Sequence, residues 1–172
     1  MNDVGVGWNE VLFGGLLVTA LIVLGLPPLH GLELPLPVAI ACGAATGALL
    51  FRSLAGARGS LPARVQLRAA LLGAPGATLA VRAVLEELAW RGFLLGALVG
   101  PLTPAPALAV ASGLFALAHS NARGRRRLVH LVTGGVFGGV YLLTGRVAAA
   151  AAAHVAYNGL IAAAIWRPAA GR

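Results

Sequence analysis

Two adjacent carboxylates and an arginine stand inside an otherwise apolar stretch of this chain. Glu86, Glu87 and Arg91 occur in LEELAWRG, between GATLAVRAV and FLLGALVG. A charged side chain near the middle of a membrane-spanning helix costs at least about 2.5–3.5 kcal/mol, so a residue kept there commonly has a function. Arg91 follows Glu87 by four residues, the order that favours an ion pair along one helix face. Glu86 points about 100° around the helix from Glu87. We therefore predict that Glu87 pairs with Arg91 and that Glu86 is free to face a cavity.

Two later apolar runs carry polar side chains at helical spacing. His119 follows Phe115 by four residues in FALAHS, and His154 precedes Asn158 by four residues in HVAYN. Residues four apart lie on one face of a helix. Three helices therefore each offer polar groups, and packing of a helix bundle could bring those groups together around one cavity.

A carboxylate and a histidine can activate a water molecule by orienting it and accepting its proton. A second histidine and an asparagine amide can stabilise the oxyanion of a tetrahedral intermediate. This set could hydrolyse an amide bond without a protein nucleophile, and it requires no cofactor. Zinc ligation by Glu86, His119 and His154 is the alternative chemistry, although the H-E-x-x-H spacing of many zinc proteases is absent.

Six apolar runs could position these side chains, since about 20 consecutive apolar residues suffice to cross a membrane as a helix. They cover residues 10–29, 36–54, 75–100, 104–121, 128–144 and 147–166 approximately. The intervening segment 55–73 contains three arginines, and we expect it to lie on the membrane surface. The predicted fold is an all-α polytopic membrane helix bundle of about six transmembrane helices. We expect one integral-membrane domain over 1–172, with the polar motifs in a core at about 75–166.

Composition and charge agree with a membrane protein. Of 172 residues, 59% are hydrophobic and 10% are charged, and all 13 basic residues are arginines. Six spans would place ten arginines on one side, with Arg146 alone on the other. Such an asymmetry indicates that the arginine-rich side, including both termini, is cytoplasmic. Because these arginines stand in short connections between apolar runs, we expect no nucleic acid as a partner. The expected partners are membrane lipid and a protein or peptide substrate.

Small residues and the remaining polar residues add further expectations. Glycines recur four apart, a spacing that lets helix backbones approach closely in lipid. The pairs are Gly43 with Gly47, Gly92 with Gly96, Gly134 with Gly138, and Gly135 with Gly139. We expect His30 and His130 at the surface or the membrane interface. Arg82 could extend the charge network or reach toward the cytoplasmic surface, and we favour the second position.

The three motifs E-E-x-x-x-R, F-x-x-x-H and H-x-x-x-N, in this order on successive helices, resemble those of the CPBP family. This family comprises CAAX proteases and bacteriocin-processing enzymes, also called Abi proteins. The resemblance implies an intramembrane glutamic endopeptidase in which Glu86 is the general base and His119 helps to hold the water. It implies an oxyanion site formed by His154 and Asn158. Glu87 and Arg91 would support these residues, and Phe115 would pack near His119.

The resemblance leaves several functions open. The substrate could carry a prenylated tail, a sorting tail or a bacteriocin sequence, cut near its C-terminal tail or membrane segment. A non-catalytic membrane partner, such as a bacteriocin immunity protein, could retain the same motifs. A proton-coupled transporter is a third possibility, because glutamate and histidine chains can relay protons in membranes, but no inverted repeat is visible. The expected location is the cytoplasmic membrane of a bacterium.

Overall fold

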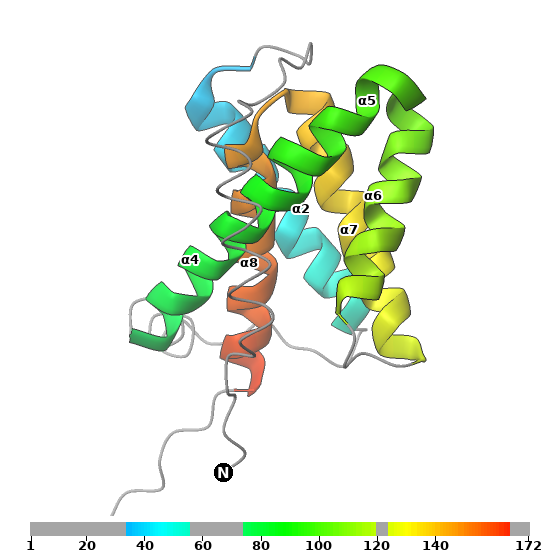
Figure 1. Ribbon diagram of the computed structural model, residues 1–172. Helices are drawn as coiled ribbons and strands as arrows, with labels where there is room; N and C mark the ends of the chain where they lie inside the picture. The colour runs from blue at the N-terminus through cyan, green and yellow to red at the C-terminus, as the bar shows by residue number, and fades with distance from the viewer. Residues whose placement is uncertain (1–33, 56–73, 120–123, 166–172) are drawn as a thin grey trace, which may run out of the picture.

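The computed structural model describes residues 34–55, 74–119 and 124–165, and every regular element in these ranges is a helix (Figure 1). The elements are α2 (Leu36–Ala55), α4 (Ala74–Glu87), the π-helix η1 (Leu88–Leu95), α5 (Gly96–Leu102), α6 (Pro104–Ala118), α7 (Arg125–Thr144) and α8 (Val147–Ile165). The predicted all-α bundle is therefore confirmed for the described part of the chain.

The predicted number of six spans is not confirmed. Among the described residues, three helices are long and apolar enough to cross a membrane, and these lie in α2, α7 and α8. Helix α6 is apolar but has only 15 residues. The run predicted at 75–100 is helical, but it is divided into α4, η1 and α5 and carries four charged residues. The run predicted at 10–29 lies outside the described residues, and so does the predicted surface segment 55–73 apart from Ala55.

The helix that carries the two glutamates changes type directly after them. Glu87, at the junction of α4 and η1, and Leu95, at the junction of η1 and α5, both have right-handed helical backbone angles, so the helix continues through 74–102. A π-helix is wider than an α-helix and is frequently found at functional sites. The wider turn begins at Leu88 and contains Arg91, so it sets how this arginine is rotated relative to Glu87.

Helices α2 and α8 approach each other so closely that a residue larger than glycine would not fit at two positions of α2. A Cβ added at Gly43 would collide with the backbone of Ala149, and one added at Gly47 would collide with that of Ala153. Both helices thus present small residues four apart, the pattern that brings helix backbones together in lipid. The expected role of Gly43 and Gly47 is confirmed, and the contact places α8 and its polar residues in the bundle.

The turns between helices define two ends of the molecule. At one end, Gly145 closes α7 in a left-handed conformation and donates its N–H to the Tyr141 carbonyl. The next residue, Arg146, donates from Nε to the Leu34 carbonyl at 2.7 Å, which ties this turn to the start of α2. The opposite end, the lower one in Figure 1, holds the start of α4, the start of α7 and the end of α8.

Candidate active site

Glu87 is fully buried and accepts two charged hydrogen bonds on one oxygen. Arg91 Nη1 lies 2.8 Å from its Oε1, and His154 Nδ1 lies 2.7 Å from the same atom. The ion pair predicted between Glu87 and Arg91 is therefore confirmed. The bond to His154 joins α4 to α8, and spacing within one helix does not predict it.

Arg91 is held on several sides. Its Nη2 donates to the Gly134 carbonyl in α7 at 3.2 Å. Its guanidinium carbon lies 4.7 Å from the centre of the Phe115 ring and 5.6 Å from that of Phe137, distances at which a cation and an aromatic face attract. A Cβ at Gly134 would come within 3.2 Å of the Phe115 ring, so glycine lets α6 and α7 approach here. Arg91 is thus a fixed positive charge behind the carboxylates.

His154 stands between the two glutamates. Its Nε2 lies 3.9 Å from Oε2 of Glu86, while its Nδ1 contacts Glu87. An ionised carboxylate that already accepts from Arg91 can only accept a hydrogen bond, so the proton of this contact is on Nδ1 of His154. The side chain of Glu86 is 31% exposed, whereas that of Glu87 is fully buried. The predicted division between a carboxylate paired with Arg91 and one that faces a cavity is present.

His119 is oriented by its own helix. Its Nδ1 lies 2.8 Å from the Phe115 carbonyl, which can only accept, so Nδ1 carries the proton. In a neutral imidazole, Nε2 is then the acceptor. The Phe115 ring lies 4.5 Å from the His119 ring, centre to centre, as expected for packing between these two residues.

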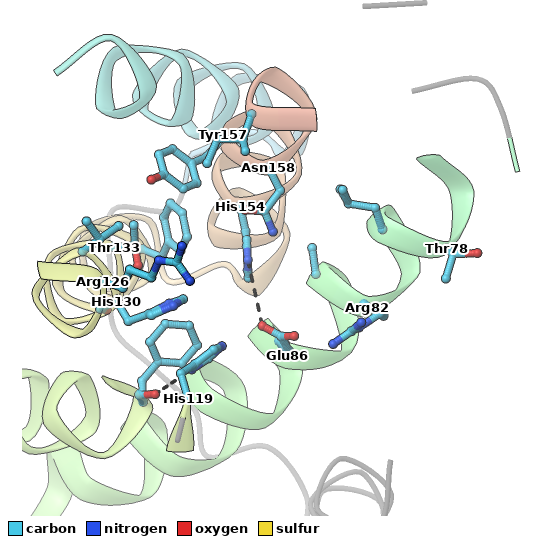
Figure 2. A pocket seen from close by; sticks show the side chains of 16 residues that line it. Thr78, Arg82, Glu86, His119, Arg126, His130, Thr133, His154, Tyr157 and Asn158 are labelled. Atoms are coloured by element: carbon cyan, nitrogen blue, oxygen red, sulfur yellow. Dashed lines mark hydrogen bonds and ion pairs between the residues drawn. The ribbon is translucent and has the colours of Figure 1, made fainter. Parts of the chain in front are cut away.

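One cavity of about 550 Å³ brings the predicted residues together. Its lining includes Glu86 from α4, His154 and Asn158 from α8, and His119 at the end of α6. Figure 2 shows these side chains directed toward a common space from three helices. Glu87 and Arg91 are absent from the lining and lie behind it. Charged and polar groups on three helices therefore face a volume large enough for part of a peptide.

The cavity also contains side chains that we expected elsewhere. His130 is half-buried, lines the cavity and stacks on His119, so it does not lie on the open surface. Its expected position at the membrane interface stays a prediction. Arg82 lines the same cavity instead of extending only toward the surface. Arg126 and Tyr157 also line it, and neither is a defining residue of the three motifs. The four-residue spacing of Arg126 and His130 was the available signal, but nothing local showed which way that face of α7 turns.

The zinc alternative gains no geometric support. Within the described ranges, no three His, Cys, Asp or Glu side chains are grouped closely enough to hold a metal ion together. Glu86, His119 and His154 share the cavity lining without forming such a cluster.

The helical bundle and its polar cavity indicate a membrane protein whose charged side chains lie among apolar helices. The family model described as "Type II CAAX prenyl endopeptidase Rce1-like" matches residues 68–160, more than half of the chain. The chain belongs to this family, and the resemblance seen in its motifs is thereby confirmed. The family is one of CAAX-type membrane endopeptidases, and the match supports that class for this chain at the level of the family. No curated protein and no solved structure matches the chain significantly.

Proposed function

We propose that this chain is an intramembrane glutamic endopeptidase that cuts a peptide bond near the C-terminal tail or membrane segment of a protein or peptide substrate. The observation that carries the proposal is the approach of Glu86 to His154, 3.9 Å apart across two helices in one cavity. His119 and Asn158 line that cavity as well. The family match supports the reaction class, since it covers all four residues.

Glu86 and His119 are the pair proposed to activate water. Glu86 is the partly exposed carboxylate, so it can accept a proton from a water molecule in the cavity. His119 carries its proton on Nδ1, so its Nε2 can accept a hydrogen bond from the same water and orient it. The water oxygen then bonds to the carbonyl carbon of the substrate as its proton moves to Glu86.

The oxyanion formed in this step requires donors, and His154 and Asn158 are proposed to supply them. Because Nδ1 of His154 donates to Glu87, Nε2 can donate to an oxyanion only when the ring carries both protons. In that form the imidazolium and Arg91 balance the charges of Glu86 and Glu87. The carboxylates of Glu87 and Glu86 thus support the charge on His154, and the four groups together are electrically neutral.

Collapse of the tetrahedral intermediate completes the reaction. Glu86 returns its proton to the leaving nitrogen, the carbon–nitrogen bond breaks, and a carboxylic acid and an amine are released. This sequence uses no protein nucleophile and leaves Glu86 ionised for another cycle. Glu87 and Arg91 contact no reacting atom in this scheme and act by holding His154.

The substitution Glu86→Gln tests this function directly. It preserves the size of the side chain but removes the base, so we expect kcat to fall by about 10²–10⁴-fold. Purified protein in lipid nanodiscs would be mixed with fluorescent peptides bearing prenylated or unmodified apolar C-terminal tails, and product would be followed by mass spectrometry. The cleaved tail identifies the substrate class.

Arg52→Gln provides a matched control, because it removes a charge from an exposed residue at the end of α2. This variant should cleave as fast as the unmodified protein. Equal cleavage by the Glu86→Gln protein would refute the glutamic mechanism. Absence of cleavage by the unmodified protein across the whole panel would favour a non-catalytic membrane partner.

A further inference from the structure

Helix α7 carries none of the family motifs, yet one stripe along it contacts three motif residues. His130, Gly134 and Phe137 follow each other at intervals of four and three residues, so they lie on one helix face. His130 contacts His119, the Gly134 carbonyl accepts from Arg91, and Phe137 contacts His154. This face of α7 therefore forms a common backing for residues from α6, η1 and α8.

The contact at His130 is the most specific of the three. Its ring and that of His119 are 4.1 Å apart between centres and inclined by only 17°, which is a stacked arrangement. The Phe115 ring lies 6.1 Å from that of His130 and 4.5 Å from that of His119, so three rings meet at this wall of the cavity. The backbone carbonyl of His130 also accepts a hydrogen bond from Thr133.

Stacking restricts a rotation of the His119 ring that the hydrogen bond of His119 leaves free. The bond from Nδ1 to the Phe115 carbonyl fixes one atom of the ring, but the ring can still rotate about that bond. A flat neighbour against the ring face restricts this rotation. The N–H groups of an imidazole lie in the ring plane, so a face-to-face contact orients the ring without passing a proton across it.

The same arrangement recurs at the second histidine. The Phe137 ring lies 4.9 Å from that of His154 at an angle of 27°, and Phe137 is 1% exposed. A non-titrating ring thus stacks on His154 in the way that His130 stacks on His119. This parallel indicates that the ring of His130, and not its ability to bind a proton, is what the site uses.

We propose that His130 is a positioning residue that holds the plane of the His119 imidazole, so that Nε2 of His119 meets the attacking water in the productive direction. The proposal rests on the proposed hydrolytic function and extends it to a residue outside the motifs.

Two substitutions separate the ring from its chemistry. His130→Phe keeps a flat ring and removes both nitrogens, whereas His130→Ala removes the ring. We expect His130→Ala to lower kcat by about 10-fold or more, because a misoriented catalytic group reduces the rate steeply. Its KM should change by less than about two-fold, since uniform substrate binding is retained. We expect His130→Phe to recover most of the lost kcat.

A readout independent of activity is available because the chain has only four histidines. Nitrogen-15 NMR of histidine-labelled protein in nanodiscs reports which ring nitrogen of His119 carries the proton. The signals of one fixed tautomer should persist in the His130→Phe protein and broaden or average in the His130→Ala protein. Leu131→Ala, which changes an exposed neighbour on the same helix, is the matched control and should alter neither readout.

Two results would overturn the proposal. If His130→Phe is as slow as His130→Ala, the site needs the imidazole itself. If His130→Ala retains both full kcat and the fixed His119 signals, the stack has no positioning role. Measuring Glu86→Gln in parallel distinguishes these failures from failure of the proposed function, because an active Glu86→Gln protein rejects the glutamic mechanism whatever the His130 variants do.

Discussion

Glu86 and Glu87 are chemically identical neighbours, and their surroundings give them different properties. Glu87 is fully buried and accepts from both Arg91 and His154, whereas Glu86 is partly exposed in the cavity. A buried carboxylate with a cationic partner cannot lose its charge without leaving that partner uncompensated. The same substitution should therefore affect stability at Glu87 and catalysis at Glu86.

Glu87→Gln should lower the free energy of unfolding by about 3–5 kcal/mol, because it leaves the charge of Arg91 buried without its counter-charge. Reversible unfolding of the protein in mixed detergent micelles would measure the change. Glu86→Gln, the matched isosteric change one residue away, should alter this free energy by less than about 1 kcal/mol. Equal stability of the two variants would show that Glu87 does not hold the Arg91 charge.

Helices hold the site through close backbone contacts as well as through hydrogen bonds. Gly43 and Gly47 of α2 lie directly against the backbone of α8, the helix that carries His154 and Asn158. The position of these two residues therefore depends on a contact between α2 and α8 in which no polar side chain takes part. A change in this contact should move α8 relative to α4.

Gly43→Ala should destabilise the bundle by about 1–3 kcal/mol, the usual effect of adding a methyl group to a filled space. Its Cβ would overlap the Ala149 backbone, which cannot yield as a flexible side chain could. The unfolding assay in mixed micelles would measure this loss, with cleavage rate as a second readout. Gly139→Ala is the matched control, because its Cβ meets no described atom within 4 Å. A loss of similar size in both variants would show that the loss does not arise from the α2–α8 contact.

At the scale of the whole molecule, the described helix ends carry more arginines at one end of the bundle than at the other. Arg52, Arg126 and Arg127 lie near the ends of α2 and α7 that share one end of the bundle, and Arg146 lies at the opposite end. Membrane proteins retain arginine-rich connections in the cytoplasm. His119, at the end of α6, and Arg126 and His130, near the start of α7, line the cavity close to the arginine-rich end. We therefore expect the cavity to be reached from the cytoplasmic half of the membrane.

Single cysteines test this orientation after Cys42, which is exposed, is replaced by alanine. In intact cells, a membrane-impermeant maleimide should label a Thr103→Cys protein and leave an Arg127→Cys protein unlabelled. Inside-out vesicles should give the reverse pattern. Labelling of Arg127→Cys from outside the cell would invert the proposed topology.

Several features of this protein depend on short distances along the chain, and these are the features that can be predicted from the sequence. The Glu87–Arg91 pair, the contact of Phe115 with His119 and the partly exposed position of Glu86 all follow from helical spacing within a few residues. The apolar runs at 36–54, 128–144 and 147–166 correspond to α2, α7 and α8. The motifs also indicated the family that the match over 68–160 establishes.

Other features depend on how each helix is rotated and tilted against its neighbours, which local spacing does not specify. No residue pattern in LAWRGFLL predicts the π-helix, which interrupts a run that the sequence suggests is one regular helix. The bond from His154 to Glu87 and the stacking of His130 on His119 arise between helices far apart in sequence. In the sequence, His130 lies close to a run of arginines, which suggests the membrane interface. In the structure it lines the cavity, because α7 packs against α6 with the face that carries His130 turned inward.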